Sequence, residues 1–310
     1  MPPYVPVCCG AQGLLVAGPG STVSRESAVA ALLRGKVEQP LLGAPAGRPL
    51  IELGRSDPSG LEIFVTLPPP GVHPNDRRYR VWVVGDGYRG ILVSDSTRIP
   101  GLVSIADIAP TALGREGGLG SRRVDDPAGY LRDLDERIDV KNDARLPASL
   151  VAAAVIALLA VARPRAAVLA AALVLGANLA LGVLAVTTPW IVVATIGLAA
   201  AAAPLLAGLP LAFAFAAVVA AYAVVLALDG TAVALSPLGP SQAGRFYGFS
   251  NLLSTLLLVP ALAGTALLWP WGAAVGLLAL VTVGASALGA DGGGAVVLAA
   301  GLLVLALRLR

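Results

Sequence analysis

The chain has 310 residues, a mean hydropathy of +0.80 and a formal net charge of +3 from 22 basic and 19 acidic residues. This small positive excess argues against a nucleic-acid-binding protein, which presents several cations on one face of a folded domain. Residues 1–146 carry 17 basic and 17 acidic residues, so residues 147–310 carry only seven charges. These seven are Arg163, Arg165, Arg245, Arg308, Arg310, Asp229 and Asp291. The composition therefore predicts a polar domain at 1–146 and an apolar, membrane-embedded domain at 147–310.

The first 20 residues lack the basic region and the apolar stretch of a secretory signal sequence. If the polar domain is exported, it needs such a signal, and we then expect a further segment upstream of Met1. Cys8 and Cys9 are adjacent and are the only cysteines, so they indicate neither a disulfide framework nor a metal site. No sequence pattern indicates a bound cofactor.

The polar domain has the strand and helix signals of an α/β fold. Apolar and β-branched runs, bounded by turn residues, predict strands at 13–18, 61–67, 80–86 and 90–94. One helix is expected to begin after Ser24, as its N-cap, and to stop at Gly35. Another is expected to begin at Pro127, capped by Asp126, and to lead into the membrane.

The turn Gly18–Thr22 lies between the first predicted strand and the first predicted helix. It is either an ordinary βα turn or a phosphate-binding loop, because backbone amides at a helix N-terminus attract anions. It lacks the lysine and the full glycine pattern of a P-loop, which favours the ordinary turn.

Polar candidates for a catalytic site follow two of the predicted strands. Asp86 ends the strand at 80–86, a position where α/β domains often place ligand groups, although Asp-Gly is also a common turn. The densest polar group follows the strand at 90–94 and consists of Asp95, Ser96, Thr97 and Arg98. Its arginine is suited to gripping a phosphate or a carboxylate.

Residues 101–114, GLVSIADIAPTALG, resemble a segment that sulfatases, phosphomutases and other members of the alkaline phosphatase superfamily carry late in their fold. With GYRGILVSDSTR before it and RFYG-x-x-N in the apolar half, the chain is similar to an uncharacterised family of actinobacterial envelope membrane proteins. That family joins a degenerate domain of the superfamily to a membrane bundle. The resemblance implies that residues 1–146 form a partial alkaline phosphatase-like α/β domain outside the cytoplasm.

The resemblance also bears on chemistry. Active members of the superfamily bind two metal ions through several aspartates and histidines around a serine or threonine nucleophile. The chain has one histidine, His73, so a two-metal site of that type is incomplete and no metal site is predicted. The family aspartate that Asp107 matches is mainly structural, which makes Asp107 an expected cap or loop anchor.

Seven apolar segments in the second half are long enough, or nearly so, to cross about 30 Å of hydrocarbon as helices. They cover residues 147–162, 166–187, 190–208, 210–228, 247–268, 270–288 and 293–308. The third and fourth meet at Gly208-Leu209-Pro210, as either one kinked helix or a hairpin. A large soluble core is the alternative, but helices without a polar face have no side to present to water. We therefore expect an all-α, multi-pass bundle in the cell membrane, in contact with lipid.

The basic residues predict the orientation of this bundle. With seven spans, the loop 163–165 and the chain end at 308–310 lie on the same side, which the positive-inside rule assigns to the cytoplasm. Residues 1–146 are then extracytoplasmic. Four basic residues between 132 and 145 count against this orientation, but acidic residues are interleaved with them.

A second polar group lies in the apolar half. Arg245 either snorkels to the membrane interface or faces a cavity. Tyr247, Asn251 and Ser254 or Thr255 recur at helical spacing, which predicts one polar face turned toward other helices. This face either bonds neighbouring helices or lines, with Arg245, a cavity for an anionic group such as a lipid phosphate.

Two functions are open on this basis. The favoured one is a non-enzymatic envelope protein that binds, moves or positions an anionic or lipid-linked component. The alternative is a membrane-anchored, metal-dependent hydrolase or transferase that acts on phosphate or sulfate esters. The single histidine favours the first.

Overall fold

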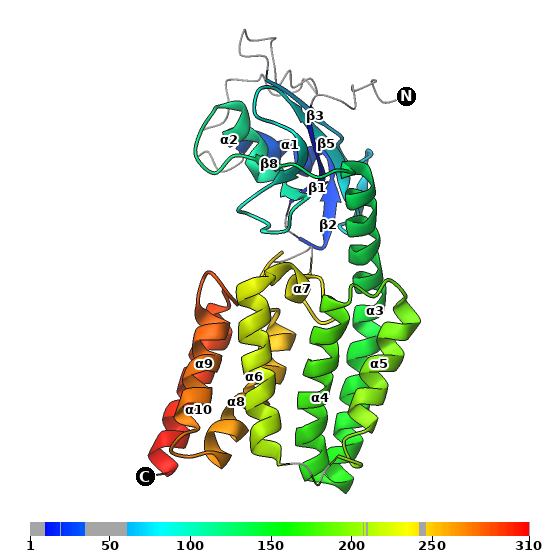
Figure 1. The fold of residues 1–310 in the computed structure, drawn as a ribbon. Helices are drawn as coiled ribbons and strands as arrows, with labels where there is room; N and C mark the ends of the chain where they lie inside the picture. Colours follow the sequence, from blue (N-terminus) through cyan, green and yellow to red (C-terminus); the bar gives the residue numbers. More distant parts are fainter. Residues whose placement is uncertain are drawn as a thin grey trace. The chain divides into compact units, whose positions relative to one another are not determined.

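The computed structural model describes residues 10–18, 20–34, 61–206, 208, 210–241 and 246–309. The chain divides into two compact units: the first comprises Met1–Glu136 and Gln242–Phe246, and the second comprises Arg137–Ser241 and Tyr247–Arg310 (Figure 1). We refer to them as the α/β unit and the helical unit, and describe each by itself.

The α/β unit is built on a mixed sheet, which the described residues form from six strands in the order β3-β5-β1-β6-β8, with β7 also paired to β1. The strands are β1 (Ala11–Val16), β3 (Glu62–Val65), β5 (Tyr79–Val84), β6 (Gly90–Val93), β7 (Leu102–Ser104) and β8 (Gly120–Arg122). The central strand β1 pairs antiparallel with β5, so that Gly13 lies opposite Val81. Its other edge pairs in parallel with β6 and then with β7. A two-stranded sheet of β2 (Thr22–Ser24) and β4 (Val72–Pro74) lies apart.

The burial of each strand depends on its place in the sheet. The central strand β1 is buried on both faces, as expected for an apolar run covered on both sides. Strand β5 alternates between buried and half-buried residues, because one of its faces packs into the core. The core includes Leu15, Val81, Leu92 and Val103, with Leu32 contributed by helix α1 (Arg25–Arg34). The predicted α/β character of this region is confirmed.

The start of α1 agrees with the sequence, but the turn before it does not open a helix. The Ser27 N–H donates to Ser24 Oγ at 3.1 Å, so Ser24 caps the helix as predicted. Strand β2 separates α1 from the preceding turn, whose Gly18 and Gly20 carbonyls accept from Asn75 Nδ2 at 2.9 and 2.8 Å. This arrangement removes the basis for a phosphate loop at that turn. The expected stop at Gly35 lies outside the described residues.

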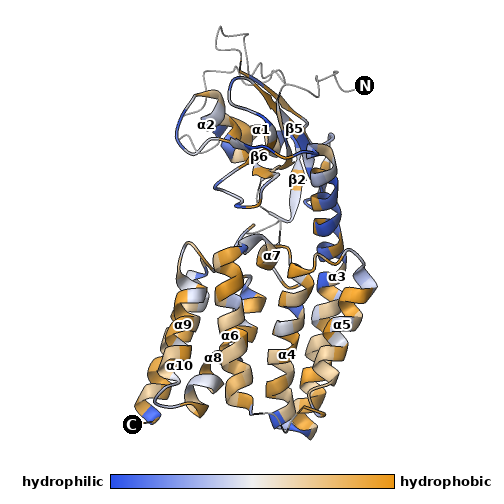
Figure 2. Ribbon diagram, in the orientation of Figure 1, coloured by the Kyte–Doolittle hydropathy of each residue, from blue (hydrophilic) through white to orange (hydrophobic). Residues whose placement is uncertain are grey.

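Helix α3 (Pro127–Ala162) passes from one unit into the other without interruption. The Gly129 N–H donates to Asp126 Oδ1 at 2.9 Å, which confirms the predicted cap. In the α/β unit Leu131 and Leu134 are buried, and a Cβ at Gly101 would lie 2.8 Å from the Leu131 side chain. Figure 2 shows the helix changing from hydrophilic in its first half to hydrophobic in its second.

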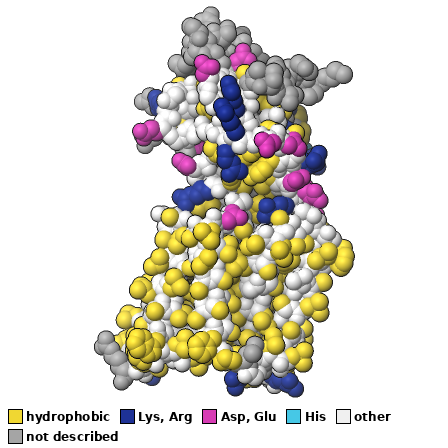
Figure 3. All heavy atoms as spheres, in the orientation of Figure 1, with side chains coloured by type: hydrophobic (Ala, Val, Ile, Leu, Met, Phe, Trp, Pro, Cys, Tyr) yellow, Lys and Arg dark blue, Asp and Glu magenta, His cyan; other side chains and the backbone are white. Residues whose placement is uncertain are grey.

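Within the described residues, the helical unit contains three helices that are long and apolar enough to cross a membrane: α3, α4 (Pro164–Val183) and α6 (Leu211–Leu228). Four shorter apolar helices are α5 (Pro189–Ala201), α8 (Asn251–Leu267), α9 (Ala273–Gly284) and α10 (Gly292–Arg308). Each of the seven predicted segments therefore contains one helix. Because α5 ends at Ala201 and α6 begins at Leu211, segments three and four form two helices and not one kinked helix. The face of this unit in Figure 3 is almost entirely hydrophobic along its helices.

One connection of the helical unit is buried instead of exposed. The short helix α7 (Gly230–Ala234) and the loop after it are buried from Ala232 to Pro240. Asn178 of α4 holds this segment: its Nδ2 donates to Ser236 Oγ and Tyr222 Oη, both at 3.0 Å, and its Oδ1 accepts from the Leu238 N–H at 2.8 Å. Lys141 Nζ donates to the Ala234 carbonyl at 2.9 Å. Irregular backbone in an apolar bundle is stable only with its polar groups paired in this way.

Candidate functional site

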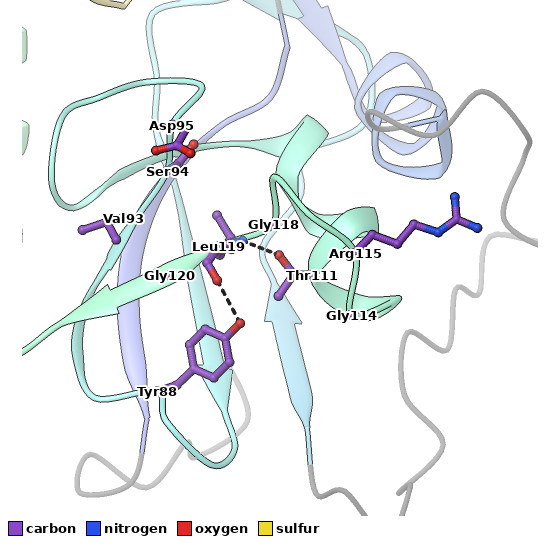
Figure 4. Close-up of a pocket in the computed structure, with 10 residues that line it drawn as sticks. All are labelled: Tyr88, Val93, Ser94, Asp95, Thr111, Gly114, Arg115, Gly118, Leu119 and Gly120. Atoms are coloured by element: carbon purple, nitrogen blue, oxygen red, sulfur yellow. Dashed lines mark hydrogen bonds between the residues drawn. The ribbon is translucent and has the colours of Figure 1, made fainter.

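The α/β unit contains a pocket of about 390 Å³ beside the carboxyl end of β6 (Figure 4). Its walls come from the turn before β6, the residues after β6, helix α2 (Ile108–Ala112), and the loop that leads from α2 into β8. The lining residues are Tyr88, Val93, Ser94, Asp95, Thr111, Gly114, Arg115, Gly118, Leu119 and Gly120. We call it the Asp95–Arg115 pocket, after its two charged residues.

Hydrogen bonds fix the wall between α2 and β8. The Tyr88 hydroxyl donates to the Leu119 carbonyl at 2.9 Å, and the Leu119 N–H donates to Thr111 Oγ1 at 2.7 Å (Figure 4). The Thr111 hydroxyl in turn donates to the Asp107 carbonyl at 2.6 Å. A Cβ at Gly118 would lie 3.0 Å from the Thr111 backbone, so this tight approach favours glycine.

Asp107 holds in place the residues that follow β6, which form the opposite wall of the pocket. Its fully buried carboxylate accepts hydrogen bonds from the hydroxyls of Ser94 and Ser96, the latter at 2.6 Å, and from the Ser104 N–H at 3.3 Å. With Ser104 it forms a capping box at the start of the turn that leads into α2. The expectation that Asp107 acts as a cap and loop anchor is confirmed.

The two charged lining residues have no partner in the described part of the chain. Asp95 and Arg115 are exposed, and among the described residues neither side chain makes a hydrogen bond or an ion pair. In Figure 4 the Arg115 side chain extends away from Asp95, so the two charges lie on different sides of the pocket. The guanidinium also points away from the other labelled lining residues, so the two side chains do not neutralise each other.

Tyr88 supplies an aromatic and uncharged part of the lining. Burial raises the pKa of Tyr88, because an ionised phenol is poorly solvated there. The phenol consequently keeps its proton to a higher pH than an exposed tyrosine does, and its hydroxyl donates to the Leu119 carbonyl.

Comparison with known proteins assigns the chain to no family. No family model, curated protein or solved structure matches the chain. The resemblance to the alkaline phosphatase superfamily thus remains a hypothesis carried by residues 101–114.

The structure separates the predicted catalytic candidates. Asp86 lies exposed in the turn after β5 and is not among the residues that line the pocket. Ser96 bonds Asp107, and the buried Thr97 hydroxyl donates to the Leu102 carbonyl, so both hold the fold. Arg98 is exposed in a left-handed backbone conformation with φ 55° and is not a lining residue. Of the five candidates, only Asp95 lines the pocket within the described part of the chain.

Sequence reasoning missed most of the pocket. Tyr88, Thr111 and Arg115 were not singled out, although the glycine-rich stretch GREGGLG at 114–120 signalled a close backbone approach. Within the described residues, no group of three or more His, Cys, Asp or Glu side chains is placed to hold a metal ion.

The second predicted group does not form one helical face. Arg245 lies outside the described residues, and Tyr247 precedes α8, which begins only at Asn251. Asn251 and Thr255 are exposed, and the Thr255 hydroxyl donates to the Asn251 carbonyl of its own helix at 2.7 Å. Ser254 is buried, and its hydroxyl donates to the Asp291 carboxylate. The chain enters the helix one turn later than expected, so of these residues only Ser254 points into the bundle, and a ligand-binding role for the group stays a prediction.

Proposed function

We propose that the protein is an integral membrane protein whose α/β unit binds an anionic or lipid-linked component of the cell envelope in the Asp95–Arg115 pocket. The observation that carries the proposal is the pocket with its hydrogen-bonded wall, at whose edge lies Arg115, a residue whose side chain has no partner among the described residues. Arginine is the side chain best suited to a planar or phosphate oxyanion.

Seven membrane spans form part of this proposal. Helix α4 has 20 residues, which at 1.5 Å each gives about 30 Å, the thickness of the hydrocarbon layer. Helices α5 and α9, with 13 and 12 residues, reach about 20 Å, and the turns beside them at 202–206 and 268–272 supply the rest of the crossing. Exposed Trp190 and Trp271 lie at helix ends, where indole rings prefer the membrane interface.

The orientation follows from the positive residues. The loop between α3 and α4 and the end of α10 lie at the same end of the helical unit (Figure 1), and both carry arginine. The positive-inside rule assigns this end to the cytoplasm, which makes the α/β unit extracytoplasmic.

A non-enzymatic role accords with the position of Asp107. The aspartate of the superfamily-like segment is engaged by two serine hydroxyls and a backbone amide, and it holds the pocket wall instead of facing a ligand. We therefore propose that the α/β unit is a degenerate, superfamily-like recognition module.

Glycerol 1-phosphate, an anionic head group without an amine, is a suitable probe. We expect calorimetric titration of the detergent-purified full chain to detect binding that Arg115→Gln weakens about tenfold, because a charge-assisted hydrogen bond is lost. Arg132→Gln removes an exposed arginine outside the pocket and should leave the affinity unchanged. Absence of binding, or equal affinity of wild type and Arg115→Gln, would refute the proposal.

A further inference from the structure

We infer that the helical unit binds an anionic phospholipid at Arg145 of α3, with the lipid phosphate against the guanidinium and the acyl chains along the apolar part of the helix. The site uses no residue of the Asp95–Arg115 pocket, so the inference goes beyond the proposed function. It shares with that proposal only the crossing of the membrane by α3, for which the helix is long and apolar enough.

Arg145 is a charged side chain that the fold leaves without a partner. It is half-buried, and within the described part of the chain its guanidinium makes no hydrogen bond and no ion pair. A guanidinium has five N–H donors, and removing them from water without acceptors is costly. A lipid phosphate supplies a charged acceptor, in the two-pronged geometry that arginine favours.

The helix itself provides no carboxylate for Arg145. Asp139 and Asp143 are exposed and lie about 120° and 160° around α3 from Arg145, at about 100° per residue. A helical side chain meets the side chains three and four positions away. At Arg145 none of these four is acidic: Lys141, Asn142, Ala148 and Ser149.

The position of Arg145 along α3 matches the level of lipid phosphates. From Arg145 to Ala162, where α3 ends, the helix rises about 26 Å at 1.5 Å per residue, close to the roughly 30 Å of the hydrocarbon layer. The neighbouring Leu146 and Leu150 are exposed, as expected for side chains in contact with lipid. The guanidinium therefore lies at the edge of the hydrocarbon layer, from which arginine side chains extend to lipid head groups.

Two further cations make the site selective for an anionic lipid. Arg137 Nη2 donates to the Gly182 carbonyl at 3.2 Å, and Lys141 Nζ donates to the Ala234 carbonyl at 2.9 Å. These bonds hold both cations on the side of α3 that includes Arg145, within about two turns of it. Their positive potential attracts a head group of net negative charge, such as phosphatidylglycerol, and disfavours one that carries an ammonium group.

The test measures the lipid bound to the full chain by native mass spectrometry, in detergent micelles with equal amounts of phosphatidylglycerol and phosphatidylethanolamine. We expect the wild type to retain phosphatidylglycerol in preference to phosphatidylethanolamine. Arg145→Gln should lower the ratio of phosphatidylglycerol-bound to free chain about tenfold, because a charge-assisted hydrogen bond is lost. Arg163→Gln removes an exposed arginine at the other end of the same helix and is the matched control, which should change nothing.

Equal retention by the wild type and Arg145→Gln would overturn the inference. An equal loss in Arg163→Gln would also overturn it, since binding would then follow net charge and not one site.

Thermal unfolding separates loss of lipid from loss of the fold. Without lipid, the midpoint of Arg145→Gln should equal or exceed that of the wild type, because a half-buried charge without a partner in the described residues is removed. Added phosphatidylglycerol should raise the midpoint of the wild type and of Arg163→Gln, but not of Arg145→Gln. A lower midpoint of Arg145→Gln without lipid would show that Arg145 stabilises the fold by itself, and would overturn the inference.

The two proposals fail independently. Arg145→Gln should bind glycerol 1-phosphate in the Asp95–Arg115 pocket with wild-type affinity, and Arg115→Gln should retain phosphatidylglycerol as the wild type does. Loss of one activity therefore leaves the other proposal in place.

Discussion

Asp107 is an ionisable residue whose charge serves the fold. A fully buried carboxylate is stable only when hydrogen bonds replace its hydration, and here Ser94, Ser96 and the Ser104 amide supply them. The residue after β6 that is free to act on a ligand is instead the exposed Asp95.

Replacing Asp107 by alanine should therefore loosen residues 94–111. Loss of the carboxylate leaves two hydroxyls and one amide without their acceptor, at a cost of about 3 kcal/mol in local opening free energy. We expect amide hydrogen exchange in β7 and α2 to accelerate roughly a hundredfold in Asp107→Ala. Asp95→Asn removes a neighbouring carboxylate that makes no bond among the described residues, and its exchange rates should equal those of wild type. Equal exchange in Asp107→Ala and wild type would contradict the anchoring role.

At the scale of single residues, the sequence predicted the roles that depend on neighbouring positions in the chain. The caps Ser24 and Asp126 were predicted because each acts within three residues of its own position, and the anchor Asp107 because its segment resembles one of the alkaline phosphatase superfamily. Tyr88 and Arg115 were not, since they meet at the pocket only through the pairing of β6 with β8. That pairing joins positions as far apart as Ile91 and Arg122, which no spacing rule reveals.

At the scale of elements, the packing of α4 against α7 depends on one glycine. A Cβ on Gly182 would lie 2.2 Å from the Ala232 carbonyl oxygen, and the small side chain is what lets the two backbones approach. Elsewhere in the same helix, Gly176 has nothing within 4 Å of where its Cβ would be.

These two glycines form a matched pair for substitution. Gly182→Ala should lower the thermal midpoint of the full chain in detergent, because overpacking costs about 1–3 kcal/mol. Gly176→Ala should leave the midpoint equal or raise it, since alanine favours a helix over glycine by about 0.5–1 kcal/mol. The fraction of monodisperse protein after heating measures both. Equal behaviour of the two variants would show that the α4–α7 contact is not close.

Predicted elements were most accurate where hydropathy or strand patterning is strong. All four predicted strands have counterparts in β1, β3, β5 and β6, and each apolar segment contains a helix. The short β2, β4 and β8 were not predicted, because three residues are too few for a period to appear. Helix α7 was also missed, since its five residues are followed by two prolines and read as part of a loop.

At the scale of the whole molecule, the number of spans and their orientation can be tested with single cysteines. In a chain with Cys8→Ser and Cys9→Ser, we introduce Arg163→Cys, Thr187→Cys or Arg308→Cys, all at exposed positions. A membrane-impermeant maleimide should label Thr187→Cys in intact cells, and the other two only after permeabilisation. Labelling of 163 and 308 from opposite sides would exclude seven spans, and labelling of both from outside would reverse the orientation.

The buried segment from Ala232 to Pro240 also constrains how the chain is made. Its Leu238 carbonyl accepts from the Ser250 hydroxyl at 2.6 Å, and Ser250 caps α8, which is synthesised later. Until α8 has been inserted, the Leu238 carbonyl must bond water, and the segment cannot pack stably among α3, α4 and α6. The closing of this internal connection thus has to wait until Ser250 and α8 have been made, and a nascent chain released before Ser250 would leave the Leu238 carbonyl without this partner.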